Sequence, residues 1–509
     1  MKRWTFFGKA ALVVGALMVS NQSCTNLDEE LFSNVDSSTG LVTKDDFISA
    51  VAGCYENLYD FAGHNGCLSI QEVSSDEAII PQRGGDWYDG GQWLRMHRHE
   101  YLATEESFNN AWNTYFTGTG RCNLIITALE AKKAEIDGAD ALIAELRALR
   151  ALYYSWVMDS FGNAPLVTYA PGDGDEYPRN ATRSELFNFV VSELTAVAPS
   201  LSKDPSAMYS RMHYYAVQAL LARVYLNAEV YTGTAKWSEA ATAANEVISS
   251  GKYSLNSNYY DNFSVDNNTT STEMVFAIPY DNASGQGFVL PAMTLHYQSQ
   301  KTFDLAFQPW NGYCTSAEFY NSYDNADARK ANFLAGQQVA SDGTNLVDPG
   351  FEANDLDGEL LNFTPELNEH FPNCLRQAGA RIGKYAFFAG QNQNCSNDFP
   401  ILRYTDILLI KAEAAFRTGD AAGALALVNQ VRARAGAAAF TEVTADNLLA
   451  ERGREFFYEG LRRQDLIRFG KYTSKLTAQM EPCADFRTLF PIPSPQLNAN
   501  PNLVQNPGY

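Results

Sequence analysis

The stretch RYTDILLIKAEAAFRTGDAAGALALVNQVRARAG, residues 403–436, predicts two helices joined by a tight turn. Apolar and small side chains recur at helical spacing in both halves, at Ile407, Ile410, Ala414, Leu425, Val428 and Val431. Between the halves, Gly419 can adopt the left-handed conformation that ends a helix, and Asp420 can cap the next one. A hairpin of this kind cannot bury its apolar face alone, so we expect similar hairpins beside it.

Further helical segments occur on both sides of this hairpin. The expected helices are 44–61 with Thr43 as its cap, 108–130, 144–162 and 184–197. A hairpin is expected at 212–253, with its turn at Gly233, and residues 447–472 comprise a further helix and its follow-on. Residues 236–240, KWSEA, begin a helix in the way that tetratricopeptide repeats do. The segments 144–162 and 184–197 form another hairpin, opened by an inserted loop.

The pattern changes between residues 255 and 399. Helical periodicity fades into short segments rich in Asn, Gly and Tyr, with a strand expected at 273–278. The predicted fold class is therefore mainly α. Tetratricopeptide-like helical hairpins form a scaffold, and the irregular, loop-rich portion with short strands is inserted between them.

Composition narrows the class of partner. The 509 residues are 46% hydrophobic and 19% charged, which suits one large folded body or two closely packed lobes. A formal net charge of −21 repels phosphate backbones, so we expect no nucleic acid partner. Aromatic residues make up 13% of the chain, a content that suits a core and equally a carbohydrate-binding or protein-binding surface.

The N-terminus predicts export. A basic start and a short apolar run at 10–19 are typical of a secretory signal peptide, which we place at 1–23. Cys24 then follows as in a bacterial lipoprotein cleavage site, although Asn21 stands where such sites usually carry Leu. The acidic residues 28–30 resemble a surface-export signal of Bacteroidetes lipoproteins and equally suit an ordinary linker. The other cysteines form no CxxC pair, which argues against a structural zinc site.

Two stretches have the composition of a sugar-binding surface, in which flat aromatic rings stand beside hydrogen-bonding side chains. The first, RGGDWYDGGQWLR at 83–95, offers Asp86, Trp87, Tyr88, Gln92 and Trp93 on a glycine-rich loop. The second, at 295–320, offers Tyr297, Trp310, Asn311 and Tyr313. The alternative for residues 310–312 is a turn with a buried Trp.

Other groups of residues are weaker candidates for a functional site. His97 and His99 could bind a metal only with a third ligand, and residues 173–176 and 355–359 have calcium-loop chemistry without the complete EF-hand spacing. We therefore expect no cofactor, with calcium as the one alternative. The charges of ERGREFFYEGLRRQDLIRFG, 451–470, are expected to pair on a wet or interdomain face, with a catalytic role for Glu455 or Glu459 as the remote alternative.

The longest motifs of the chain, taken in order, resemble those of a known protein family. RALRALYYSWVMDSFGNAPL, ALLARVYLNAEVY, the opening stretch, ERGREFFYEGLRRQDLIRFGKY and the proline-rich end LFPIPSPQLNANPNLVQNPGY resemble the SusD/RagB family of outer-membrane nutrient-binding lipoproteins. The resemblance implies a cell-surface, outer-membrane lipoprotein, acylated at Cys24, that binds glycan (or, in some members, peptide) over a SusC-like TonB-dependent transporter. It also implies ligand aromatics in loops from the two regions named above.

The resemblance gives the expected division of the chain. A SusD-like region with helical repeats occupies 24–254, the aromatic-rich insertion 255–400, and a RagB/SusD region 401–509, whose proline-rich end straps across the repeats. The leading hypothesis is noncatalytic capture of oligosaccharide or polysaccharide and its delivery to the transporter. The alternatives are peptide capture on the same fold and a glycoside hydrolase that uses Asp86 or Asp89.

Overall fold

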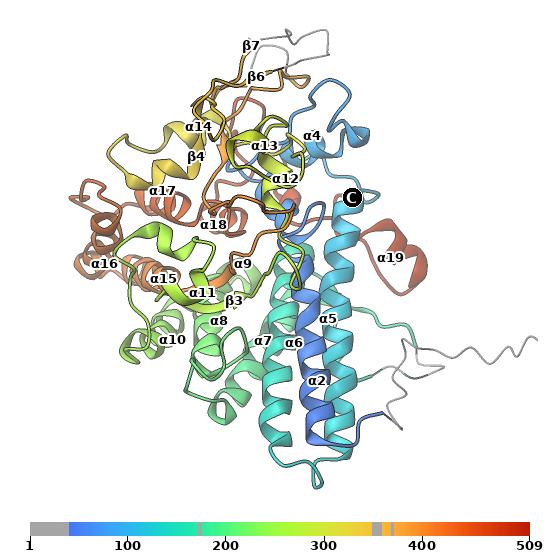
Figure 1. Ribbon diagram of the computed structural model, residues 1–509. Helices are drawn as coiled ribbons and strands as arrows, with labels where there is room; N and C mark the ends of the chain where they lie inside the picture. The colour runs from blue at the N-terminus through green and yellow to red at the C-terminus, as the bar shows by residue number, and fades with distance from the viewer. Residues whose placement is uncertain (1–39, 171, 173–175, 349–358, 368–370) are drawn as a thin grey trace, which may run out of the picture.

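The protein is described here by a computed structural model, which covers residues 40–170, 172, 176–348, 359–367 and 371–509 (Figure 1). Helices dominate this part of the chain, and its strands occur only in antiparallel pairs. The mainly helical fold class is therefore confirmed. Cys24, the expected signal peptide, the 28–30 segment and most of the two calcium-loop segments lie outside the described residues.

The N-terminal helices stand side by side and largely match the sequence expectation (Figure 1). They are α2 (Lys44–Tyr55), α5 (Glu106–Ala131), α6 (Ala139–Phe161) and α7 (Arg183–Val197). Thr43 caps α2 as expected, and the Asp46 carboxylate completes a capping box. Helix α2 ends at Tyr55 rather than near residue 61, because the chain tightens into the 3₁₀ helix η1 (Glu56–Asp60).

The expected hairpins pack against one another. The first comprises α8 (Tyr214–Leu226), α9 (Ala228–Thr232) and α10 (Trp237–Ser249), and the second comprises α15 (Tyr404–Arg417) and α16 (Ala421–Arg434). Gly419 has a φ of 91°, and the Asp420 carboxylate accepts a 2.9 Å hydrogen bond from the Gly423 amide. Helix α10 contacts both α8 and α15, so each hairpin buries its apolar face against the next.

The irregular portion is joined to the hairpins by a strand pair. The strand expected at 273–278 is β3 (Met274–Ile278), which pairs antiparallel with β10 (Phe399–Arg403). Strand β10 was not predicted; it runs directly into α15 and is buried along its whole length. The insertion therefore begins and ends at one small sheet beneath the α15–α16 hairpin.

The remaining elements are short. The helices are α3 (Cys67–Val73), η2 (Asp89–Gly91), α4 (Gln92–His97), η3 (Ala198–Ser200), η4 (Tyr259–Asn262), α11 (Asn267–Thr270), α12 (Leu290–Thr294), α13 (Ser299–Thr302), α14 (Ala317–Asn321), η5 (Ala328–Asn332), α17 (Ala445–Phe456), α18 (Arg462–Arg468), η6 (Asp485–Thr488) and α19 (Ser494–Ala499). The strand pairs are β1 (Ala164–Pro165) with β2 (Asn180–Ala181), β4 (Phe333–Leu334) with β9 (Arg381–Ile382), β5 (Gly336–Gln337) with β8 (Asn362–Phe363), and β6 (Val347–Asp348) with β7 (Glu359–Leu360).

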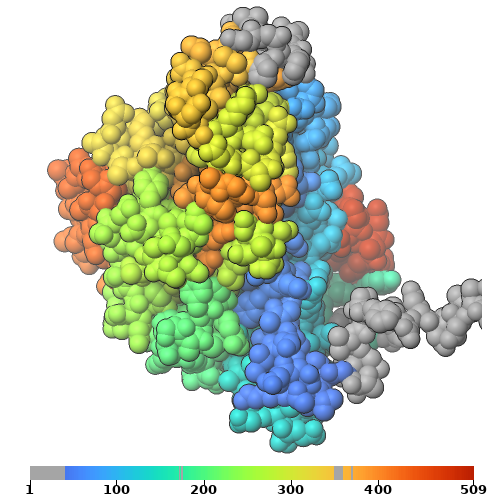
Figure 2. Space-filling view, viewed as in Figure 1, coloured from blue at the N-terminus to red at the C-terminus, as the bar shows by residue number. Residues whose placement is uncertain are grey.

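A single large apolar core runs through all three portions of the chain. It includes Phe47 of α2, Phe288 of the insertion and Ile492 of the C-terminal segment, each fully buried. The space-filling view shows the yellow-green insertion packed directly against the blue N-terminal segments (Figure 2). The loop-rich portion is thus held by the same core as the helices.

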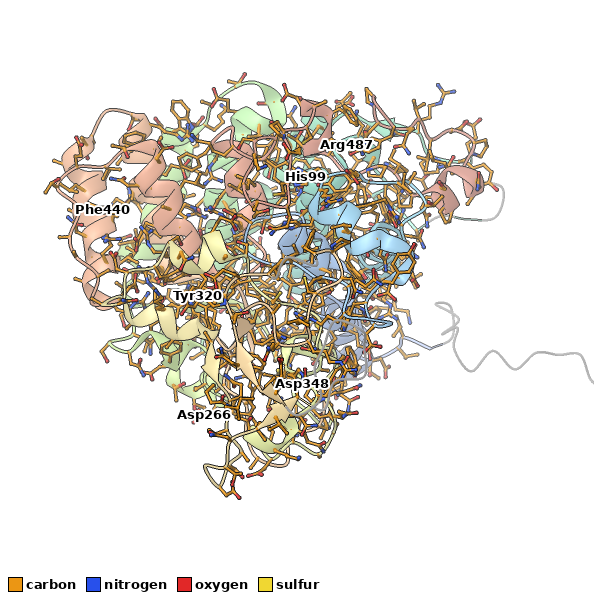
Figure 3. All side chains as sticks on the ribbon, turned by 90° about the horizontal axis from the view of Figure 1, so that it is seen from above. His99, Asp266, Tyr320, Asp348, Phe440 and Arg487 are labelled. Atoms are coloured by element: carbon orange, nitrogen blue, oxygen red, sulfur yellow. The ribbon has the colours of Figure 1, made fainter. Side chains whose placement is uncertain are left out.

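The two histidines considered as metal ligands are core residues. His97 donates from Nδ1 to the Val73 carbonyl and accepts at Nε2 from the Thr477 hydroxyl. His99, labelled in Figure 3, stacks on Tyr472 with ring centroids 4.2 Å apart. No group of three or more potential metal ligands converges in the described ranges. Within those ranges, no helix combines the length and apolar character that a membrane span requires.

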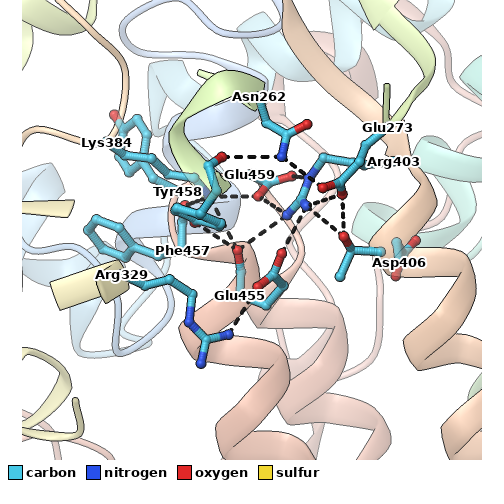
Figure 4. A network of polar contacts seen from close by, with 12 residues as sticks. Asn262, Glu273, Arg329, Lys384, Arg403, Asp406, Glu455, Phe457, Tyr458 and Glu459 are labelled. Carbon is cyan, nitrogen blue, oxygen red and sulfur yellow. Dashed lines mark hydrogen bonds and ion pairs between the residues drawn. The ribbon is translucent and has the colours of Figure 1, made fainter. Parts of the chain in front are cut away.

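The charged residues of the 451–470 motif form a buried network with distant partners (Figure 4). Arg403, at the start of α15, contacts Glu273, Glu455 and Glu459 at 2.8 to 2.9 Å. Burial alone would raise the pKa of Glu455, but the Arg434, Arg403 and Arg329 guanidiniums hold it far below its usual range. The face is therefore buried rather than wet, and each carboxylate of the motif is paired with cations inside the core.

The C-terminal segment crosses the ends of the long N-terminal helices. The amides of Phe490 and Ser494 donate to the carbonyls of Ser160 and Ala103, at 2.9 and 2.8 Å. The Asn506 amide group donates to the Phe161 carbonyl at 2.7 Å. These bonds, with those from the Gln496 side chain to Asn109 and Asn113, fasten the proline-rich end beside α5 and α6. Helix α19, in the middle of this segment, was not predicted.

Candidate functional site

The two aromatic stretches singled out in the sequence meet in space. Ile79 and Cys314 form a β-bridge with hydrogen bonds of 2.8 and 3.0 Å, and this bridge brings the loop after residue 80 beside the loop before residue 314. Figure 1 shows the result near the top of the view, where α4 lies next to α12 and α13. Residues more than 200 positions apart therefore share one surface.

The first loop is a tight β-hairpin that is held in place by a buried arginine, Arg83. Gly84 and Gly85 form its two-residue turn, and Arg83 and Asp86 exchange backbone hydrogen bonds of 2.9 and 3.1 Å. The buried Arg83 guanidinium donates to three main-chain carbonyls of the insertion, those of Leu375 (2.7 Å), Arg376 (3.1 Å) and Ala378 (2.8 Å). The loop is therefore fixed in position before its exposed residues begin.

Trp87 links the two loops. Its indole Nε1 donates a 2.7 Å hydrogen bond to the Trp310 carbonyl. A Cβ added at Gly312 would lie 2.3 Å from the indole ring, so only glycine fits there. Trp87 and Asn311 both have a φ near +60°, a conformation that non-glycine residues rarely adopt and that clusters at functional sites.

His64 lies at the centre of the aromatic rings. Its ring centroid is 5.2 to 5.9 Å from those of four neighbours, namely Trp87, Trp93, Trp310 and Tyr313. Its Nδ1 lies 3.1 Å from the Tyr313 hydroxyl. Burial lowers the pKa of His64 to about 4, so the ring is neutral at neutral pH. The cluster is thus an uncharged aromatic floor.

A cleft of about 380 Å³ opens over this floor. Its lining residues are His64, Asp86, Trp87, Asp89, Tyr297, Gln308, Pro309 and Trp310. Both carboxylates hold rings in place, because Asp86 accepts from the Tyr297 hydroxyl and Asp89 accepts a 2.7 Å hydrogen bond from the Trp93 indole. The arrangement combines partly exposed rings with fixed hydrogen-bonding groups, which is the chemistry that a sugar requires.

The nine residues selected from the sequence fall into three groups. Asp86, Trp87, Tyr297 and Trp310 line the cleft. The rings of Trp93 and Tyr313 are buried beneath it. The other three do not line the cleft: Gln92 and Asn311 are buried, and Tyr88 is exposed elsewhere.

Four lining residues lie outside those nine. Asp89 was considered only as an acid of the hydrolase alternative, and His64, Gln308 and Pro309 were not predicted. Gln308 and Pro309 directly precede Trp310 but carry no distinctive pattern. His64 lies in the sequence AGHNG, whose flanking glycines resemble those of the RGGDWYDGG loop. That similarity is the one signal that could have identified it.

Comparison with known proteins identifies the fold family. A family model described as the SusD family matches residues 388–509, and one described as starch-binding and associating with the outer membrane matches residues 36–226. Together these matches cover more than half of the chain. The chain belongs to the SusD/RagB family.

Individual relatives of the SusD/RagB family extend over most of the chain. The starch-binding protein SusD of Bacteroides thetaiotaomicron is 27% identical over 419 residues, which are 72% of each chain. The structure of surface glycan-binding protein A of the same species, in complex with laminarihexaose, covers 91% of this chain and 100% of its own with a TM-score of 0.74 and 25% identity. A SusD superfamily protein of Parabacteroides distasonis shares the fold with a TM-score of 0.73, 22% identity and coverage of 92% and 100%.

Membership of the SusD/RagB family decides whether the chain is an enzyme or a binding protein. SusD family proteins are noncatalytic binding proteins, which confirms the expectation that the chain is not an enzyme. The hydrolase alternative, with Asp86 or Asp89 as a catalytic acid, is therefore wrong. The two carboxylates position aromatic rings instead.

Proposed function

We propose that this protein captures an oligosaccharide or polysaccharide at the cell surface in the cleft over His64 and passes it to a SusC-like TonB-dependent transporter. The observation that carries the proposal is the convergence of Trp87, Trp310 and Tyr297 from two distant loops around one open cleft. The names of relatives that bind starch or laminarihexaose support a glycan as the ligand. The family model's description supports association with the outer membrane.

The cleft suits sugar better than peptide. A peptide bound in extended form needs an open strand edge or a row of backbone groups. The lining of this cleft presents aromatic rings, the Gln308 amide and the carboxylates of Asp86 and Asp89. Sugar rings offer CH faces to aromatics and hydroxyls to carboxylates and amides, so both kinds of lining group find partners. The lining of the cleft therefore supports glycan capture better than peptide capture.

The anchor and the transporter complete the proposal. Acylation of Cys24 would tether the protein to the outer membrane after removal of residues 1–23. The helical-hairpin scaffold would then contact the transporter, while the cleft lies between the loops that the scaffold supports. Labelling with a radioactive fatty acid checks the anchor, because a Cys24→Ala variant is expected to lose the label.

A substitution at Trp310 tests the binding site. Affinity electrophoresis in native gels that contain soluble starch, laminarin or other polysaccharides identifies the glycan that retards the wild-type protein. Trp310→Ala is expected to weaken that interaction at least about tenfold, because it removes one stacking face. Its melting temperature should change little, since the ring is only partly buried.

The matched control is Trp237→Ala, which removes an equally large, partly buried ring at the start of α10, away from the cleft. This control should be retarded like the wild type. Equal retardation of wild type and Trp310→Ala in the glycan that binds would refute the site. No retardation of the wild type by any glycan, combined with binding of a peptide library, would favour peptide capture.

A further inference from the structure

The two ring nitrogens of His64 have different surroundings. His64 lines the aromatic cleft and is partly exposed, whereas Tyr313 beneath it is fully buried. The Nδ1 atom of His64 lies 3.1 Å from the Tyr313 hydroxyl. Because the two nitrogens of an imidazole ring point in widely different directions, Nε2 faces away from Tyr313.

Nε2 of His64 is accessible from outside the protein. No group in the described residues forms a hydrogen bond with it, yet it is not one of the unpartnered polar atoms that are sealed in the interior. Nε2 of His296, by contrast, is one of those sealed atoms. A group that occupies the cleft can therefore reach the His64 ring at this nitrogen.

A chain of hydrogen bonds leads to the opposite nitrogen, Nδ1. The Asn65 backbone amide donates a 3.0 Å hydrogen bond to the Ser69 hydroxyl oxygen. The Ser69 and Tyr313 hydroxyls are 2.7 Å apart, and the Tyr313 hydroxyl in turn contacts His64 Nδ1. Ser69 and Tyr313 are both fully buried, so the proton of each hydroxyl needs an acceptor within the protein.

Only one direction of this chain leaves no buried proton unpaired. If Ser69 donates to Tyr313, then Tyr313 donates to His64 Nδ1, and both hydroxyl protons have an acceptor. In the reverse direction, His64 donates to Tyr313 and Tyr313 donates to Ser69, whose own proton then has no acceptor among the described residues. An unpaired buried donor costs free energy, so the first direction is favoured.

The direction of the chain determines which nitrogen of His64 carries the proton. Burial lowers the pKa of His64 to about 4, so the ring is neutral at neutral pH and has one N–H. Since Nδ1 accepts from Tyr313, that proton is on Nε2. His64 therefore presents an N–H donor to the cleft.

A donor at this position complements the carboxylates of the cleft. Asp86 and Asp89 are exposed and, when ionised, accept hydrogen bonds only. They can bind the hydroxyl groups of a sugar, but its ring oxygen and bridging oxygens have no proton to give them. An N–H at His64, like the amide of Gln308, supplies a partner for such oxygens.

We propose that Nε2–H of His64 donates a hydrogen bond to an oxygen of the bound sugar, and that Ser69 and Tyr313 fix the tautomer in which it does so. This inference rests on the proposed function and adds a specificity-determining residue to it. Ser69 and Tyr313 are positioning residues, because this chain acts on the ligand only through His64.

Nuclear magnetic resonance of the free protein tests the tautomer. In protein labelled with ¹⁵N at histidine, long-range ¹H–¹⁵N spectra distinguish protonated from unprotonated ring nitrogens, and His64→Gln identifies the signals of His64. At neutral pH we expect an unprotonated Nδ1 and a protonated Nε2. Tyr313→Phe removes the donor to Nδ1, so the signals of both nitrogens should move toward intermediate positions. A proton on Nδ1 in the wild type would overturn the inference.

Two substitutions of His64 separate hydrogen bonding from packing. His64→Phe keeps an aromatic ring but has no N–H, whereas His64→Gln loses the ring and keeps an amide donor. Isothermal titration calorimetry with laminarihexaose and maltohexaose measures the affinity. For the hexasaccharide that binds, we expect His64→Phe to weaken binding at least about tenfold and His64→Gln less than about threefold. The opposite order would overturn the inference, because the ring would then matter and the donor would not.

A double-mutant cycle tests whether Tyr313 acts through His64. Tyr313→Phe should weaken binding about two- to threefold in the wild-type background and should have no effect in the His64→Phe background. Equal losses in both backgrounds would contradict the positioning role. His64→Phe leaves the buried Tyr313 hydroxyl without its acceptor, so thermal melting of each variant must show that it is folded at the temperature of titration.

The outcomes distinguish this inference from the proposed function. Binding that Trp310→Ala weakens and His64→Phe does not would overturn the inference and leave the proposed function standing. Failure of the wild type to bind any glycan of the electrophoresis panel would overturn the proposed function and, with it, the ligand part of the inference. The spectrum of the free protein decides the tautomer in either case.

Discussion

Two clusters hold the same loop-rich insertion, and they do so by opposite means. On one side, Glu273 and Arg329 of the insertion meet Arg403 and Glu455 in a charge network that is sealed in the core. On the other side, Trp310 and Tyr313 meet Trp87 and His64 in an aromatic cluster below an open cleft.

The difference lies in what each cluster leaves unsatisfied. Every carboxylate of the sealed network that contacts Arg403 is paired with cations, so the network has nothing to offer a ligand. The aromatic cluster is closed below and exposes rings and hydrogen-bonding groups above. We therefore expect substitutions in the network to change stability and substitutions in the aromatic cluster to change binding.

The largest effect is expected from Glu455→Ala. This change leaves the guanidiniums of Arg329 and Arg403, each 2.9 Å from Glu455, without that partner inside the core. Removal of one member of a buried ion pair costs about 3–5 kcal/mol of unfolding free energy. Urea denaturation followed by circular dichroism measures it.

An exposed pair gives the control for that stability prediction. Lys44 and Asp137 lie 3.1 Å apart, and the Asp137 side chain is 97% exposed. Asp137→Asn should leave the urea midpoint unchanged within error. A destabilisation by Glu455→Ala no greater than that of the control would contradict the assignment of the network to stability.

A smaller effect, confined to binding, is expected from Gly312→Ala. The new methyl group would fall 2.3 Å from the Trp87 indole and displace it from the cleft. Glycan affinity should decrease about tenfold, which corresponds to about 1.4 kcal/mol. Affinity electrophoresis measures the loss, with Gly53→Ala of α2 as a control, because Gly53, like Gly312, lacks a positive φ but has no neighbour within 4 Å of an added Cβ. Equal affinity in the two variants would mean that the position of Trp87 does not govern binding.

The smallest expected effect is that of pH on glycan affinity. Because burial lowers the pKa of His64 to about 4, its charge does not change between pH 8 and 5, and affinity should be constant there. The unfolded chain takes up this proton near pH 6.5, so His64 makes stability fall as the pH falls from about 6.5 to about 4. Calorimetric titrations with the glycan at several pH values measure the affinity. A change in affinity with its midpoint near pH 6.5 would show that His64 is not buried as described.

The sequence predicts the helical half of this molecule well, for a local reason. In the hairpin 403–436, the signals are a periodic apolar face, a glycine at 419 and a capping carboxylate at 420, and all of them lie within one stretch of chain. Strand β10 gives no such signal, because its partner β3 lies more than 100 residues earlier. The helical periodicity of 403–436 therefore predicts α15 and α16 but not the strand that leads into them.

The candidate site is predicted only in part for the same reason. Aromatic and glycine content identifies Trp87 and Trp310, but no local pattern shows that His64 lies between them. The pairing of Glu455 with Arg329 likewise joins residues far apart in the sequence. Spacing shows that charges will pair along 451–470, and only the fold shows that they do so in the interior.

The anchor of the first loop has a consequence for which of its positions can vary in sequence. The Arg83 guanidinium binds three main-chain oxygens, which are present whatever side chains stand at positions 375, 376 and 378. The attachment through Arg83 therefore does not depend on the side chains at those three positions, whereas within the tip, residues 84–91, Trp87 makes a contact of its own to the Trp310 carbonyl. Sequence changes in the tip that keep Arg83 and Trp87 are therefore the ones expected to alter the exposed groups while the loop stays in place.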